Sequence, residues 1–153
     1  MRIWHIFTQL SALIWVAAAL WFPPLGHPFT VLAPFSLPNG QYAAGHRGVD
    51  LPALPGASVR APAAGSVTFV GTVVDRPVLT LRTDARTLVS FEPIVSDLEV
   101  GDRVERGELI GTVSTGGHCA ERCLHAGIRV NGEYVNPLGW FRARPVLLPL
   151  SND

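Results

Sequence analysis

Short runs of β-forming residues, each bounded by turn-forming residues, fill the chain from residue 57 onward and restrict what it can fold into. No long segment after residue 23 shows a convincing helical periodicity. Strands that recur about every 8–12 residues are typical of a sandwich or barrel. We therefore expect an all-β domain, built as a small antiparallel β-sandwich or partly open barrel. The expected strands span residues 65–74, 78–81, 87–91, 103–104, 109–113, 124–130 and 134–135.

Three local signals refine this expectation. Gly71 predicts a kink within the first strand, because a glycine inside a strand often marks a bend. Arg76-Pro77 predicts the turn to the return strand. Asn131-Gly132 predicts a tight hairpin turn of type I′, since that turn needs a positive φ at both central residues and Asn-Gly tolerates it.

The first 22 residues predict an apolar helix that precedes the domain. Met1-Arg2 gives a positive end, residues 3–22 are almost entirely apolar, and Ala17-Ala18-Ala19 offers a small-residue cleavage site. The apolar stretch, at about 20 residues, is also long enough to cross a bilayer once. Signal peptide and membrane anchor both stay open. Either one places the rest of the chain outside the cytoplasm, secreted or membrane-anchored.

Proline content marks the next boundary. Residues 23–44 hold five of the 13 prolines and predict a mostly extended linker. The domain itself is expected over residues 45–141. Residues 142–153 form a tail in which no function is readable.

The charge balance excludes one class of partner. The chain carries 12 basic and 12 acidic residues, for a formal net charge of zero. Electrostatics therefore favours neither nucleic acid nor an anionic membrane surface, and we expect membrane contact only through the N-terminal segment. The basic residues are all arginine, so the chain contains no lysine.

Two short segments carry the residues with metal-binding chemistry. His46 and Asp50 lie in the first, and His125 lies about 75 residues later. Two imidazoles and a carboxylate are a good ligand set for Zn²⁺. In a straight strand His46 and Asp50 would lie about 13 Å apart, which is too far for one metal. Gly48 offers the bend that would bring them together.

Alternation along the later segment places His125 and Cys123 on one face of a strand, with Leu124 turned to the core. Taken alone, a histidine in such a strand is more often a core residue than a ligand.

Three collinear stretches together resemble a known family. They are HRGVDLPALPGASVRAPAAGSVTFVG, VGDRVERGELIGTV and CLHAGIRVNGEYVNP, within about residues 45–138. They are similar to the M23 peptidases, the LytM or lysostaphin type of cell-wall endopeptidase. The resemblance implies zinc ligands at His46, Asp50 and His125, and a substrate among the peptide cross-links of bacterial peptidoglycan. An export signal suits that substrate.

The sequence departs from the family pattern at two positions. Family members usually have histidines where this chain has Glu92 and Cys123, and the resemblance implies that histidines there orient the attacking water and stabilise the oxyanion. The sequence most resembles a branch with E-P and H-C…C-L-H signatures, associated with exported proteins of actinobacteria.

Catalysis with the remaining residues requires a general base. Three protein ligands leave one zinc position for water, as in catalytic zinc sites. Glu92 is one candidate base, and His118, in a glycine-rich loop, is the other. Arg47 or Arg129 is a candidate for holding the oxyanion. The alternatives are that Glu92 only pairs with an arginine and that His118 is a solvated loop residue.

Cys119 and Cys123 are the only cysteines and admit three interpretations. In an oxidising compartment they would form a disulfide and make the wall of the cleft rigid. Alternatively, Cys123 would give zinc a fourth ligand, which makes a closed structural site. Two free buried thiols are the third interpretation.

The main hypothesis is therefore an exported zinc metalloendopeptidase acting on peptidoglycan peptides. The alternative is a zinc-binding, catalytically inactive domain of the same family that binds cell wall or regulates another hydrolase. The stretch VGDRVERGELIGTV also resembles half of a biotinyl or lipoyl carrier domain. A carrier domain needs a lysine, and the absence of lysine excludes it.

Overall fold

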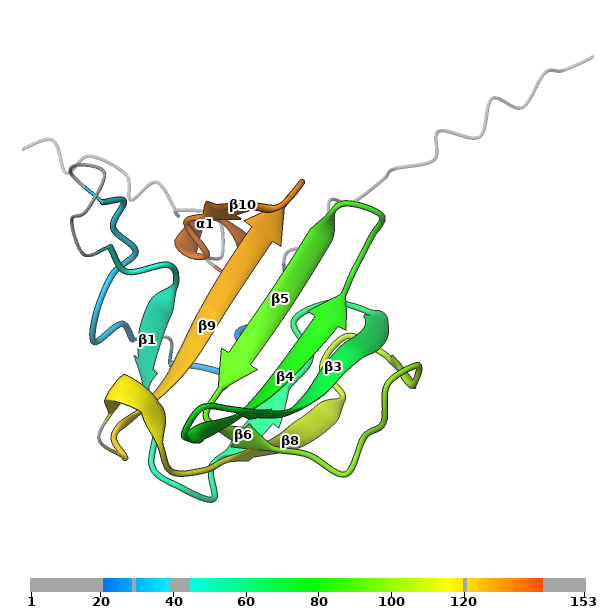
Figure 1. Cartoon of the computed structure of the whole chain (residues 1–153), viewed down its shortest axis with the longest axis horizontal. Coiled ribbons are helices and arrows are strands. Elements are labelled where there is room, and N and C mark those ends of the chain that lie inside the picture. Colours follow the sequence, from blue (N-terminus) through cyan, green and yellow to red (C-terminus); the bar gives the residue numbers. More distant parts are fainter. Residues whose placement is uncertain (1–20, 29, 39–44, 120, 142–153) are drawn as a thin grey trace, which may run out of the picture.

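Two antiparallel sheets face each other across one apolar core (Figure 1). The structure is a computed structural model that describes residues 21–28, 30–38, 45–119 and 121–141. The helical elements described are a 3₁₀ turn, η1 (Gly117–Cys119), and a single-turn helix, α1 (Leu138–Phe141). The strands are β1 (Val49–Pro52), β2 (Ser58–Arg60), β3 (Gly65–Val73), β4 (Arg76–Arg82), β5 (Thr87–Glu92), β6 (Ile94–Val95), β7 (Arg103–Val104), β8 (Leu109–Val113), β9 (Cys123–Val130) and β10 (Glu133–Val135).

The larger sheet has the order β1-β9-β5-β4-β3-β7, and β10 pairs with the far end of β9. The smaller sheet has the order β2-β8-β6. This arrangement confirms the all-β antiparallel sandwich, or half-barrel, expected from the sequence. The strands β1, β2 and β6, of two to four residues each, were not among the expected ones.

Two of the three local predictions need correction. The irregularity in β3 lies between Val67 and Phe69, not at Gly71, which pairs regularly with Val78. Arg76 and Pro77 pair with Val73 and Thr72, so they begin β4 and the turn lies before them. The type I′ turn at Asn131-Gly132 is confirmed, since their φ values are 51° and 87°.

Alternation along the strands separates the core from the opposite face. In β5, Thr87, Val89 and Phe91 are buried, while Leu88, Ser90 and Glu92 are only partly buried. Leu124 on β9 is fully buried, as predicted, and its neighbour His125 is not. One face of the large sheet therefore builds the core, and its other face is free to carry polar side chains.

The proline-rich segment is more than a linker in its described part. Residues 30–38 run antiparallel to β1, through bridges between Ala33 and Asp50 and between Ser36 and His46. Val31 and Phe35 pack against the core. This segment therefore forms an extra edge beside the strand that carries Asp50.

The apolar N-terminal helix expected over residues 1–22 lies almost entirely outside the described residues. Within the described ranges, no helix is long and apolar enough to span a membrane.

Truncating a core aromatic tests this assignment of faces. Phe91 has no exposed surface, whereas Phe69 on β3 is 39% exposed. Phe91→Ala should lower the free energy of unfolding by roughly 3–5 kcal/mol, because it removes buried apolar surface and leaves a cavity. Urea titration followed by tryptophan fluorescence measures the loss. Phe69→Ala is the matched control, and equal losses in the two variants would contradict the assignment.

Candidate metal centre

Strand register places three chemically active side chains in one row. Asp50 on β1 is paired with His125 on β9, and His125 is paired with Glu92 on β5. Directly opposed residues of adjacent antiparallel strands project to the same face. The row therefore lies on the face of the large sheet that does not build the core.

His46 reaches Asp50 because the chain bends between them. A side chain at Gly48 would place its Cβ 2.5 Å from the Ala126 carbonyl oxygen and 2.5 Å from His125 Nε2. Only glycine therefore lets this segment pass so close to β9. The result is that His46 Nε2 lies 3.0 Å from Asp50 Oδ1, rather than the 13 Å or so expected in a straight strand.

The Pro34 carbonyl fixes the orientation of the His46 ring. His46 Nδ1 lies 2.8 Å from that oxygen. A carbonyl oxygen only accepts hydrogen bonds, so Nδ1 is the donor, and in the neutral ring Nε2 keeps its lone pair. Metal-binding histidines are commonly held in this way by a backbone carbonyl on the opposite ring nitrogen.

The three atoms at the centre of the cluster require a positive charge among them. His125 Nδ1 lies 2.7 Å from Asp50 Oδ1 and 3.2 Å from His46 Nε2. A proton on His125 Nδ1 would satisfy one contact, but His46 Nε2 and Asp50 Oδ1 would still be two acceptors in contact. Tetrahedral zinc with bonds of about 2.0–2.1 Å has ligand atoms about 3.3 Å apart. The donor set and its spacing therefore fit zinc.

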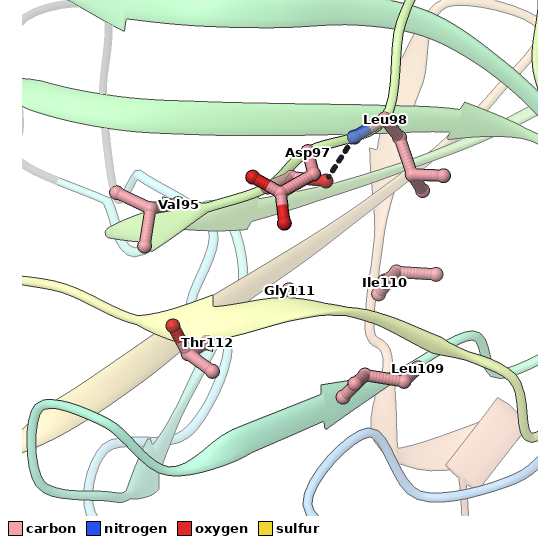
Figure 2. A pocket seen from close by; sticks show the side chains of 8 residues that line it. Val95, Asp97, Leu98, Leu109, Ile110, Gly111 and Thr112 are labelled. Atoms are coloured by element: carbon pink, nitrogen blue, oxygen red, sulfur yellow. Dashed lines mark hydrogen bonds between the residues drawn. The ribbon is translucent and has the colours of Figure 1, made fainter.

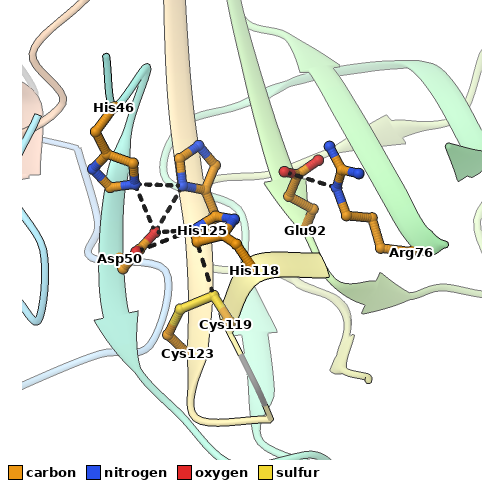
Figure 3. Close-up of a disulfide and its surroundings, with 8 residues drawn as sticks. All are labelled: His46, Asp50, Arg76, Glu92, His118, Cys119, Cys123 and His125. Atoms are coloured by element: carbon orange, nitrogen blue, oxygen red, sulfur yellow. Dashed lines mark hydrogen bonds and ion pairs between the residues drawn. A yellow bond between two sulfur atoms is a disulfide. The ribbon is translucent and has the colours of Figure 1, made fainter. Parts of the chain in front are cut away.

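His118 brings a third imidazole to the same carboxylate (Figure 3). Its Nε2 lies 3.1 Å from both Asp50 oxygens, although the side chain is half exposed. His46, Asp50, His118 and His125 each offer one ligand atom within 4.8 Å of the others. The sequence allowed His118 to be a base or a solvated loop residue but not a donor to the metal, because nothing in its loop predicts where the loop lies.

Asp50 is held as a carboxylate. Its burial alone would raise its pKa, but hydrogen bonds to His125 and His118, with the charges of those rings, outweigh burial and lower the pKa from its ordinary value. The residue is only 7% exposed. A buried carboxylate is therefore stable here because the imidazoles surround it.

Cys119 and Cys123 form a disulfide, which confirms the first of the three interpretations. Cys123 is the first residue of β9, and Cys119 is the last of η1. The bond therefore ties the loop that carries His118 to the strand that carries His125. In this state Cys123 is not available as a thiolate ligand for zinc.

Glu92 is directed toward Arg76 and not toward the imidazoles (Figure 3). Its Oε1 lies 3.0 Å from Arg76 Nε, and this partly buried pair raises the pKa of Arg76. The structure thus shows Glu92 in an ion pair with an arginine, one of the two alternatives that the sequence left open for this residue.

A groove of about 250 Å³ continues the site beyond His125. Arg47 lines it, whereas Arg129 lies outside the lining. The guanidinium carbons of both arginines lie close to the Tyr134 ring centroid, at 5.5 and 5.6 Å. No sequence pattern indicated that Tyr134, Arg76 or Pro34 belongs to the site. The lining residues are Arg47, Arg76, Ser90, Glu92, His125, Gly127 and Tyr134.

A second hollow, of about 350 Å³, lies beside the small sheet (Figure 2). It is formed by residues 95–98 and 109–112. Asp97 is its one titratable lining residue. The single carboxylate beside Val95, Leu109 and Ile110 offers too few ligands for zinc and has no partner with which to act as a base. The imidazole cluster is therefore the better candidate for a functional site.

Comparison with known proteins agrees with this geometry. The model of peptidase family M23 matches residues 44–137. The chain belongs to peptidase family M23. An uncharacterized protein of Mycobacterium tuberculosis is 36% identical over 137 residues, which cover 85% of this chain and 55% of that protein. This M23 chain therefore spans about half the length of the curated relative.

Solved structures share the M23 fold. A variant of the catalytic domain of the prophage-encoded M23 protein EnpA from Enterococcus faecalis superposes with a TM-score of 0.65 and 24% identity, over 76% of this chain and 95% of that one. A zinc-containing peptidase from Vibrio cholerae gives a TM-score of 0.67 and 18% identity, over 76% of this chain and 39% of that one. At such identities the likeness concerns the fold alone.

Gly48 offers a test of the metal centre. Gly48→Ala should weaken zinc binding at least about tenfold, because the new methyl group collides with His125 and displaces a proposed ligand. Competition with a chromophoric chelator measures the affinity. Gly139→Ala is the matched control, since a Cβ there meets nothing within 4 Å. Unchanged affinity in Gly48→Ala would contradict the proposed geometry.

The disulfide should stabilise the fold measurably. Its cysteines are four positions apart, and closing so short a loop is worth about 2 kcal/mol in the chain-entropy account. The double variant Cys119→Ser, Cys123→Ser should lose that amount of unfolding free energy in urea titrations. Wild-type protein treated with a reducing agent should match the variant. Equal stability of the oxidised protein and the variant would contradict a role in stability.

Proposed function

We propose that this M23 protein is an exported zinc metalloendopeptidase that hydrolyses peptide bonds of bacterial peptidoglycan. The observation that carries the proposal is the convergence of His46, Asp50 and His125 within 3.2 Å of one another in a family of peptidases. The apolar segment of residues 1–22 supports a location outside the cytoplasm, where that substrate lies.

The proposed ligands are His46 through Nε2, His125 through Nδ1 and Asp50 through Oδ1. Zinc held there would act as a Lewis acid toward the scissile carbonyl and would acidify a water molecule. The chain's own contribution is to group these atoms, because β1, β9 and the bend at Gly48 bring them together.

We assign the general base to His118 in preference to Glu92. His118 Nε2 lies among the grouped ligand atoms, whereas Glu92 is engaged by Arg76. A base within reach of the attacked bond would take a proton from the water and return it to the leaving amine. The Cys119–Cys123 bond would hold the ring within this reach.

A second candidate function also has an observation in its favour. His118 places a fourth donor at the cluster, and four protein ligands would complete the tetrahedral coordination of zinc, as in structural sites. The protein would then be a zinc-bound but inactive M23 domain that binds the cell wall or regulates another hydrolase. Turnover decides between the two functions.

The test is hydrolysis of purified wall material by zinc-loaded protein, read as new free amines. His118→Ala should lower the rate by a factor of roughly 10²–10⁴ with zinc content unchanged, the range expected when a general base is lost. His125→Ala should lose both zinc and activity. His27→Ala, an exposed histidine outside the cluster, is the control and should leave the rate unchanged.

Three outcomes would contradict parts of this proposal. A loss of activity in Glu92→Gln but not in His118→Ala would move the base to Glu92. Full zinc content without any release of amines would favour the inactive domain. Retention of zinc by His125→Ala would contradict the proposed ligand set.

A further inference from the structure

We propose that the groove beside His125 binds a carboxylate-bearing residue of the substrate peptide, and that Arg47 is the residue that recognises it. This inference rests on the proposed function and adds the chemical class of the residue next to the cleaved bond. It follows from three features: the glycine that lines the groove, the balance of the charges around it and the way Arg47 is held.

Gly127 lines the groove between His125 and Arg47. It follows His125 by two positions on β9, so both face the groove. A Cβ at Gly127 would lie 3.2 Å from the Arg47 carbonyl oxygen, 3.7 Å from Tyr134 Cε1 and 3.9 Å from His125 Nε2. A larger side chain would therefore crowd Arg47, Tyr134 and the proposed metal ligand where they border the groove.

The charges in the groove leave one guanidinium unneutralised. Arg76 is compensated by Glu92 at 3.0 Å and by Asp75 at 3.3 Å. Among the residues that the structure describes, no carboxylate lies within ion-pair distance of Arg47. Counted over its charged lining residues, Arg47, Arg76 and Glu92, the groove carries one net positive charge, and it therefore suits an anionic group.

Tyr134 holds Arg47 in a form suited to binding an anion. The Arg47 guanidinium carbon lies 5.5 Å from the Tyr134 ring centroid, within the range of a cation–π contact. A guanidinium over an aromatic face keeps the N–H donors at its edge, and those donors match the two oxygens of a carboxylate. Arg47 also directly follows His46, a proposed metal ligand. The recognised carboxylate should therefore belong to a residue flanking the scissile bond.

This assignment replaces the oxyanion role considered from the sequence for Arg47 and Arg129. Arg129 contacts the same Tyr134 ring, at 5.6 Å, yet it does not line the groove. It therefore provides a matched control, with the same residue type and the same aromatic neighbour but no access to the groove.

The experiment compares two synthetic peptides, acetyl-Ala-Glu-Ala-amide and acetyl-Ala-Gln-Ala-amide, which differ in one carboxylate. Binding to the zinc-loaded full chain is measured by calorimetry or by NMR titration. We expect the Glu peptide to bind about tenfold more tightly than the Gln peptide, as for one charge-assisted contact. This preference should disappear in Arg47→Gln and persist in Arg129→Gln. A carboxylate that bound zinc directly would keep its preference in Arg47→Gln, and that outcome would overturn the proposal.

A second variant tests the location without removing the Arg47 guanidinium. Gly127→Val should weaken both peptides with zinc content unchanged, because it fills the groove without changing a charge. Unchanged binding in Gly127→Val, or no preference in the wild-type protein, would also overturn the proposal. Because this is a binding experiment, its outcome is separate from that of the wall digest. Release of amines without a carboxylate preference would contradict only this inference, and a preference without release would contradict only the proposed function.

Discussion

The contact between one buried carboxylate and three imidazoles is the constraint on which the site depends. Asp50 Oδ1 lies within 3.1 Å of ring nitrogens from His46, His118 and His125. These rings come from a bend, a disulfide-tied loop and a strand. The carboxylate is stable in its buried position only while the rings surround it. Metal affinity and local order should therefore depend on the same set of contacts.

The two faces of the large sheet divide stability from chemistry. Phe91 and Glu92 are neighbours on β5, as Leu124 and His125 are on β9, and in each pair the first is buried in the core. The apolar face fixes strand register, and register fixes which polar residues meet on the other face. A slip of one residue between β1 and β9 would break the core and would also separate Asp50 from His125.

The two positions that depart from the usual family pattern are engaged in specific contacts. Glu92 pairs with Arg76, and Cys123 is bonded to Cys119. The disulfide holds η1 beside β9, and η1 delivers His118 to Asp50. In the proposed enzyme His118, carried by the loop at η1, thus takes the catalytic role of the histidine that family members usually have at the position of Cys123 on β9. The family's fold is retained, while this side of the site is built differently.

The sequence by itself determined the fold class, the faces of the longer strands, the Asn131-Gly132 turn and the family, because alternation, turn chemistry and motif order are local properties. It also named His46, Asp50 and His125, and it recognised the need for a bend at Gly48. It misplaced the irregularity in β3 and the turn before Arg76, since both depend on which strand pairs with which. Only the tertiary structure decided that His118 reaches Asp50, that Pro34 orients His46, and that Arg47 lines a groove with no described carboxylate within ion-pair distance. Those facts arise from contacts between segments far apart in the chain, which no local pattern specifies.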